Sequence, residues 1–169
     1  MPYTMKVDGM DKITEMLEKT GEAATGIAAR ALYIGAGIVA DEISRGAREV
    51  TTKPFRYAQG WQRHPSPEEK EAVVSAGAAG IAKFQKTGNE VNTSIGYRRS
   101  GYAMIAGKRK PIPLIVNAIN SGTSFMQKQP FIRKAVSSSK NKATEAITEE
   151  VESLVMKALD TGNVPTSEE

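Results

Sequence analysis

Several residue types on which enzyme sites and secreted folds depend are missing or scarce in this sequence. Its 169 residues include no cysteine, which excludes disulfide bonds and thiolate metal sites. A hydrolytic site needs a nucleophile and a base that a third group orients. The one histidine, His64, stands beside Pro65 in a loop, so such a site has little support. No apolar run approaches the roughly 20 residues that span a bilayer, and the opening MPYTMKVDGMDK has none of signal-peptide length. We therefore expect a protein made in a cytosol-like compartment.

Motifs that bind cofactors or perform catalysis are also weak or absent. The chain has no Gly-x-x-x-x-Gly-Lys phosphate loop. GAGIVA at residues 35–40 matches the dinucleotide fingerprint in form, but helical periodicity on both sides leaves no strand before it, so we expect small residues that let another helix approach closely. Ser137 and Lys140 have a Ser-x-x-Lys spacing without its partner motifs, which favours exposed helix surface. We expect no catalytic residue, no cofactor and no metal.

Aromatic residues make up only 6% of the chain, while 40% is hydrophobic and 25% charged. This composition fits one globular domain with a modest core, built largely from small residues on closely packed helices. We expect that domain to cover residues 1–162, with a flexible tail at residues 163–169.

The net charge of +4 is unevenly distributed. From Lys83 to Lys142 the charged residues are basic apart from Glu90, and after Lys142 acidic residues dominate. A basic middle and an acidic end can bring copies of the chain together head to tail, or can bind nucleic acid. A solvated basic face without any partner is the third interpretation.

Three stretches are predicted to be helices. Apolar residues recur every three or four positions from Met10 to about residue 49, with a break near Gly21 or Gly26 as the alternative. The sequence SPEE at residues 66–69 has the pattern of a capping box and predicts a short helix to about residue 76. The last helix is predicted from Pro130 to just before residue 162.

Strand patterns lie between these helices. Residues 3–7 alternate as a short strand, and residues 81–85 and 90–98 predict a β-hairpin around Thr-Gly-Asn. Val91, Thr93, Ile95 and Tyr97 share one face of its second strand. Residues 102–106 suggest a third strand with a basic tip at residues 107–110, and residues 114–119 a short helix. We thus predict an α+β fold with a small, mostly antiparallel β-sheet packed against long N-terminal and C-terminal α-helices.

Residues 51–65 form a proline-containing and aromatic loop. It holds Phe55, Tyr57 and Trp61 among Lys53, Arg56 and Arg63. Aromatic and basic residues interleaved in this way can stack on single-stranded nucleic acid. They can equally anchor the loop to the core or insert into a neighbouring subunit.

Residues 117–135 read as the end of one helix, a polar loop and the start of another. Asn120 and Gly122 are types that adopt positive φ after a helix, and Pro130 suits a first helical turn. The loop carries Phe125 and Met126, and loops rarely expose large apolar residues. We therefore expect this joint to be the hinge of the fold and a contact surface.

Three stretches together resemble a known family. They are GIAKFQKTGNEVNTSIGY at residues 80–97, INSGTSFMQKQPFIRKA at residues 119–135, and DGMDKITEMLEK near the N-terminus. The chain resembles the tail-component or head–tail joining family of tailed bacteriophages. The resemblance implies a virion structural protein of the neck, assembled in the cytoplasm of the bacterial host, that connects the head connector to the tail tube. Such proteins form rings, most often six-fold, around the DNA channel.

The implied partners are further copies of the chain, neighbouring connector and tail-tube or tail-terminator proteins, and DNA in transit, without a membrane. The expected interface residues are Gly122, Thr123, Phe125, Met126, Pro130, Phe131 and Arg133. The residues expected to face DNA or an acidic partner are Arg98, Arg99, Lys108, Arg109 and Lys110. The alternative function is a small basic protein that binds nucleic acid.

Overall fold

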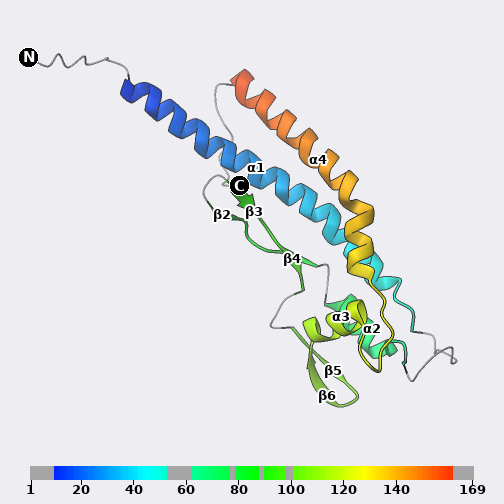
Figure 1. Cartoon of the computed structure of the whole chain (residues 1–169). Coiled ribbons are helices and arrows are strands. Elements are labelled where there is room, and N and C mark those ends of the chain that lie inside the picture. Colours follow the sequence, from blue (N-terminus) through cyan, green and yellow to red (C-terminus); the bar gives the residue numbers. More distant parts are fainter. Residues whose placement is uncertain (1–9, 53–61, 77–78, 88–89, 98–100, 162–169) are drawn as a thin grey trace, which may run out of the picture.

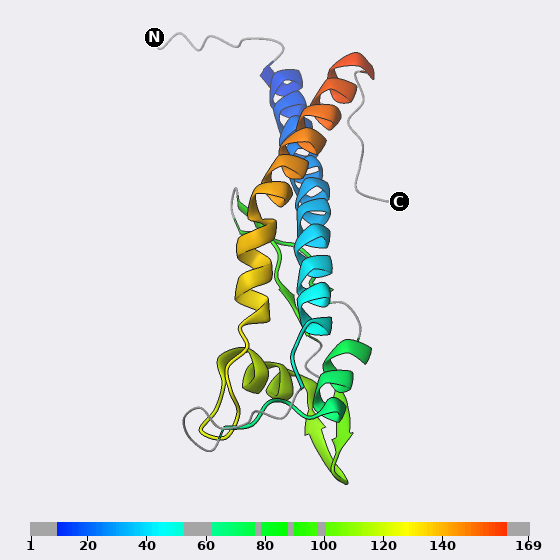
Figure 2. The same ribbon diagram turned by 90° about the vertical axis from the view of Figure 1, so that its right-hand side faces the viewer.

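The structure is a computed structural model, and it describes residues 10–52, 62–76, 79–87, 90–97 and 101–161. The predicted strand at residues 3–7, the tail at residues 163–169 and the aromatic residues Phe55, Tyr57 and Trp61 lie outside the described residues. The fold is α+β, as predicted, with two long helices at its N- and C-terminal sides. The helices run side by side, and the smaller elements lie along and below them (Figures 1 and 2).

The two long helices form an antiparallel pair. Helix α1 (Met10–Arg48) and helix α4 (Phe131–Thr161) extend about 58 Å and 46 Å at 1.5 Å per residue. Arg30 forms an ion pair with Glu150 at 2.9 Å, and further along the pair Ser138 donates a hydrogen bond to Glu42 at 3.0 Å. The two contacts show that α1 and α4 run in opposite directions, because the later residue of α1 contacts the earlier residue of α4. Helix α1 is continuous, so the alternative of a break near Gly21 or Gly26 is wrong.

Small residues on α1 allow α4 to approach closely. A Cβ added at Gly35 would lie 2.5 Å from Ile147 Cδ1, and one added at Gly46 would lie 3.4 Å from Phe131 Cβ. Ala31, Ala40 and further alanines are buried on α1. This confirms the expectation that residues 35–40 belong to a helix-packing face. Gly37, by contrast, has open space around it.

The predicted hairpin is present as one interrupted ribbon. Strands β1 (Gly80–Ile81) and β4 (Ile95–Gly96) pair in antiparallel fashion, and so do β2 (Gln85–Thr87) and β3 (Glu90–Asn92). Three residues separate β1 from β2, whereas two separate β3 from β4, so the register shifts by one residue. The Ala82 N–H donates to Ser94 O and the Thr93 hydroxyl donates to Ala82 O within this interruption.

This ribbon packs its half-buried face on α1. Residues 91–97 alternate between half-buried and exposed, and Val91, Thr93, Ile95 and Tyr97 are the half-buried members, as the sequence predicts. Next to β2, the Phe84 ring meets the Tyr33 ring of α1 edge-on, with 6.1 Å between centroids. The ribbon therefore covers the middle of α1.

Strand β5 (Tyr102–Ile105) does not join that ribbon as a third strand. It pairs with β6 (Lys108–Pro111), with Tyr102 opposite Pro111 and Ile105 opposite Lys108. The turn residues Ala106 and Gly107 have φ of 50° and 74°, which is the geometry of a two-residue hairpin turn. The sheet content therefore consists of two-stranded units among the described residues. The basic residues 108–110 form a strand and not a loop tip, because the pairing extends to Lys108.

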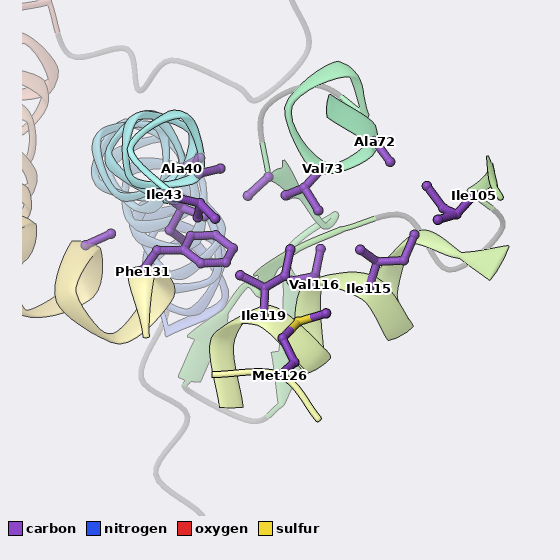
Figure 3. Packing of buried hydrophobic residues seen from close by; sticks show 14 residues of the cluster. Ala40, Ile43, Ala72, Val73, Ile105, Ile115, Val116, Ile119, Met126 and Phe131 are labelled. Atoms are coloured by element: carbon purple, nitrogen blue, oxygen red, sulfur yellow. The ribbon is translucent and has the colours of Figure 1, made fainter. Parts of the chain in front are cut away.

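Two short helices complete the end of the molecule that carries β5 and β6. Helix α2 (Pro67–Ser75) has the predicted capping box between Ser66 and Glu69, and helix α3 (Ile112–Ser121) begins two residues earlier than predicted. Ile119 and Val73 are fully buried where these helices meet, and Met126 and Phe131 belong to the same buried cluster (Figure 3). The main core therefore lies between the C-terminal part of α1, the start of α4 and the short helices.

Candidate interaction surface

The joint between α3 and α4 turns on Gly122. This residue caps α3 with φ of 78°, and its N–H donates to Ala118 O at 3.0 Å. A Cβ there would lie 3.0 to 3.2 Å from the Cβ, N and Cα atoms of Lys128. Positive φ and close approach both favour glycine, so the chain reverses tightly at this point.

Thr123 then shapes the loop that follows. Its N–H donates to Met126 O at 2.9 Å, and its hydroxyl accepts hydrogen bonds from the N–H groups of Phe125 and Met126 at 3.2 and 3.0 Å. The turn points the two apolar residues in different directions. Met126 is 5% exposed, whereas Phe125 is 71% exposed.

The expected interface residues of the joint therefore divide into core and surface. Met126 and Phe131 belong to the core, and Pro130 is half-buried. Phe125 and Arg133 are exposed. Of the large apolar residues predicted to contact either a neighbour or the core, only Phe125 is left for a neighbour.

The same joint holds both ends of the segment at residues 53–61. The Arg63 N–H donates to Phe125 O at 2.7 Å, and the Gln127 N–H donates to Arg63 O at 2.9 Å. The Gln129 side chain exchanges two hydrogen bonds with the Thr51 backbone and lies 3.2 Å from His64 Nδ1. Pro65 is fully buried. The described ends of the loop are thus fixed to the fold, while its aromatic residues lie outside the described ones.

An ion-pair cluster that the sequence did not predict links three elements. Glu69, whose side chain is 5% exposed, accepts hydrogen bonds from Arg63 at 2.7 and 2.8 Å and from the Ser66 N–H at 2.9 Å. The Lys110 ammonium of β6 lies 3.7 Å away. The Arg63 guanidinium holds the pKa of Glu69 below its ordinary value, with smaller help from the Ser66 N–H and Lys110. Lys110 is therefore engaged within the fold.

The other predicted basic residues of the hairpin are exposed. Antiparallel register places Met104 opposite Arg109 and Tyr102 opposite Pro111, and these four residues share one face. We call this face the outer face of the hairpin. The Arg109 guanidinium carbon lies 4.1 Å from the centroid of the Tyr102 ring, a cation–π contact. Arg98 and Arg99 lie outside the described residues.

Sequence reasoning missed most of the exposed apolar side chains at this end. Tyr102, Met104 and Leu114 are 50%, 65% and 62% exposed, in addition to Phe125. The alternation of Tyr-Ala-Met-Ile was the available signal, because Ala103 is half-buried and Ile105 is buried on the opposite face. Two of the three missed residues thus belong to the outer face of the hairpin.

The structure offers little for catalysis among the described residues. A cleft of about 420 Å³ separates the end of α1 from the start of α4, but Arg45 already pairs with both Glu42 and Glu49 at its wall. Ser137 and Lys140 are exposed on α4, as predicted. Within the described ranges, no three acidic or histidine side chains gather to hold a metal ion. Nor does any helix in them have the length and apolar character to cross a membrane.

Comparison of the chain with protein-family models, curated proteins and solved structures gave no match.

Proposed function

We propose that this chain is a structural subunit of the phage neck, a ring-forming tail-completion or head–tail joining component that connects the head connector to the tail tube. The observation that supports this most directly is the set of large apolar side chains at one end of the molecule. Tyr102, Met104, Leu114 and Phe125 are each at least half exposed. Single exposed apolar residues are ordinary, but four within 24 residues of sequence favour a surface that other proteins cover.

The arrangement of the two long helices supports the same proposal. Within the described ranges, the distal halves of α1 and α4 form a projecting pair of helices, and such a pair buries only one stripe of each helix (Figure 2). This is the shape of a subunit that gains burial on assembly.

The distribution of charge favours a head-to-tail assembly, in which the basic segment of one subunit contacts the acidic segment of the next. Residues 101–144 contain eight basic residues and no acidic one, while residues 145–152 contain four glutamates. A heterologous contact between unlike surfaces generates a ring if its rotation closes, and six-fold closure requires about 60° per subunit. The family resemblance of residues 80–97 and 119–135 favours this ring as part of a phage neck.

Two measurements test the proposal. Light scattering after size-exclusion chromatography of the purified protein should show an oligomer, and cryo-electron microscopy of phage-like particles should show a ring containing this chain at the neck. A protein that is monomeric at every concentration and absent from purified particles would refute it.

A nucleic-acid-binding protein is the second candidate, and one observation favours it. The eight basic residues between residues 101 and 144 include Lys108 and Arg109, both exposed on a β-ribbon. Binding through phosphate contacts loses affinity steeply as salt rises. Titration of labelled DNA at two salt concentrations separates the candidates, because a ring subunit need not bind free DNA tightly.

A further inference from the structure

The outer face of the hairpin is largely exposed in the part of the chain that the structure describes. Tyr102 and Met104 are 50% and 65% exposed there, and Arg109 lies over the Tyr102 ring and forms no ion pair with a described carboxylate. Tyrosine and arginine are among the residue types enriched at energetically important interface positions. Phosphate binding does not require two large apolar side chains, so this face fits a protein surface that has both apolar and acidic groups.

Such a surface exists at the opposite end of the same chain. Glu145, Glu149, Glu152 and Met156 are all exposed on α4 at spacings of four, three and four residues, which places them in one stripe. We call it the distal stripe of α4. It lies opposite the buried Ala143 and Leu154, which contact the rest of the fold. Met156 is 60% exposed.

The glutamates of this stripe are available for a partner. Glu150, which lies outside the stripe, forms the ion pair with Arg30 of α1. No such pair joins Glu145, Glu149 or Glu152 to a cation among the described residues. The stripe spans about 17 Å along the helix, close to the roughly 13 Å of a four-residue strand.

The two surfaces cannot meet within one molecule. Both views of the fold place the hairpin at one end of the long axis and the last turns of α4 at the other (Figures 1 and 2). We infer that the outer face of the hairpin of one copy docks on the distal stripe of α4 of a second copy, with Arg109 against the glutamates and Tyr102 and Met104 beside Met156. The inference rests on the proposed ring-forming function and specifies its subunit contact.

The contact is small, so its strength depends on closure of the assembly. One hairpin and one helix stripe bury less than a standard interface of about 1600 Å². Each copy supplies one surface of each kind, which permits a chain of copies of any length. A closed ring has one contact more than an open chain of the same number of subunits. This last contact forms within one assembly, so it forms at high effective concentration.

Charge reversal tests the polar half of the contact. Arg109→Glu and Glu149→Arg should each weaken self-association about tenfold or more, because each places like charges together. The combined variant Arg109→Glu/Glu149→Arg, and an equimolar mixture of the two single variants, should regain association. Lys140→Glu and Glu71→Lys, which reverse exposed charges elsewhere, should have little effect. Circular dichroism checks that every variant is folded.

Crosslinking tests the geometry without requiring a stable ring. The chain contains no cysteine, so Met104→Cys/Met156→Cys introduces the only two thiols. Under mild oxidation this variant should give a ladder of disulfide-linked multimers, whereas the control Met104→Cys/Val136→Cys, whose second site is on the proximal part of α4, should give far less. Absence of the ladder at high protein concentration, or failure of the charge swap to regain association, would overturn the inference.

Other outcomes separate this contact from the proposed function. If rings assemble normally with Arg109→Glu, the contact is wrong while the ring-forming function stands. If Arg109→Glu lowers only the affinity for a labelled DNA duplex, the outer face of the hairpin binds nucleic acid and the inference fails. If the protein forms open filaments and Met104→Cys/Met156→Cys still gives the ladder of disulfide-linked multimers, the contact is supported and the closed ring is not.

Discussion

Glu69 connects parts of the chain that sequence places far apart. Its carboxylate caps α2 through the Ser66 N–H, pairs with Arg63 at the end of the loop at residues 51–65, and lies near Lys110 of the hairpin. A buried carboxylate is costly unless it is paired and hydrogen-bonded, and here both oxygens are engaged. Glu69 is therefore one of the residues that join the hairpin to α2, together with Glu68, which accepts a hydrogen bond from the Ala106 N–H.

Glu69→Gln should lower the free energy of unfolding by about 1.5 kcal/mol at neutral pH, because hydrogen bonds to charged groups contribute about 1.5–3 kcal/mol. We take the lower part of that range because Arg63 is half exposed and its charge is screened. The pKa of Glu69 is lowered in the folded state, chiefly by Arg63. The stabilisation is thus fully present above the ordinary pKa of 4.5 and is lost as pH falls through the folded-state value.

Urea unfolding of the wild type and of Glu69→Gln at neutral and acid pH measures this effect. The two proteins should differ at neutral pH and converge in acid. Glu71→Gln is the matched control, since Glu71 is exposed on the same helix. An equal difference between wild type and Glu69→Gln at both pH values would show that the charge of Glu69 does not stabilise the fold.

Tyr97 presents the opposite situation, a polar group left without a partner. Its hydroxyl is buried and has no hydrogen-bond partner within the described ranges, and burial raises the pKa of Tyr97 to about 12. Tyr97→Phe should therefore leave the free energy of unfolding unchanged or raise it by about 1 kcal/mol, because it removes an unsatisfied hydroxyl. A loss of more than about 1 kcal/mol in urea unfolding would reveal a hydrogen bond that the hydroxyl makes in solution.

The raised pKa also predicts behaviour in alkali. The folded-state pKa of Tyr97 lies above the ordinary value of 10.0. The contribution of this group to the free energy of unfolding is therefore fully present below pH 10.0 and declines as pH rises toward 12. The decline should disappear in Tyr97→Phe. Spectrophotometric titration of tyrosinate, compared between the two proteins, identifies the group that titrates late.

For single residues, interactions between close neighbours in the sequence were predictable, whereas interactions between residues far apart in the sequence were not. Ser66 and Glu69 are three residues apart, so the pattern SPEE was enough to predict the capping box. The pairing of Glu69 with Lys110 depends on how α2 and β6 pack, and no local pattern encodes that. Exposure of Phe125 beside buried Met126 was equally inaccessible, because both residues are apolar and adjacent in one loop.

Among the elements, the α1–α4 pair makes the sharpest prediction, through two glycines on α1. Gly37→Ala should raise the free energy of unfolding by about 1 kcal/mol, because alanine is the better helix former and nothing lies within 4 Å. Gly35→Ala gains the same propensity but forces Ile147 and α4 aside, and overpacking costs about 1–3 kcal/mol. Thermal and urea unfolding should rank Gly37→Ala above wild type and Gly35→Ala below Gly37→Ala.

The reverse order would mean that α4 does not lie against Gly35 in solution. Equal stabilisation by both variants would carry the same meaning, because helix propensity alone would then decide the outcome. The comparison is well matched, since the two positions are two residues apart on one helix and receive the same side chain.

The helices were predicted closely and the strands less so, for a physical reason. Helix limits follow from signals within a few residues, such as Pro130 before α4 and Gly122 after α3. Strand partners are set by packing. The alternation at residues 91–97 gave the correct buried face. The pairing of β5 with β6 was missed because their turn, Ala106-Gly107, lacks the Asn-Gly or Asp-Gly sequence typical of two-residue hairpins, and residues 108–110 are all basic. The candidate surface was found only in part, because exposure depends on these pairings.

The whole molecule consists of a well-packed end and a projecting pair of helices. Around Ile119 and Val73, several elements bury apolar side chains together, as Figure 3 shows for the labelled residues. Among the side chains that the structure describes in the distal part of this pair, Ile27, Ala29 and Ala31 of α1 and Leu154 of α4 are buried. Fewer elements meet there than around Ile119, so we expect each described residue of the distal part to bury less apolar area, and to contribute less free energy, than a core residue.

Hydrogen exchange followed by mass spectrometry should therefore show a gradient along the long axis of the free protein. Peptides around Ile119 and Val73 should exchange slowest, near the rate set by global unfolding, and peptides from residues 145–157 should open locally and exchange faster. On assembly, protection should rise at residues 145–157 and in the hairpin, because both surfaces become covered. Uniform exchange along α4 in the free protein would contradict the gradient. Protection confined to the core on assembly would place the subunit contact elsewhere.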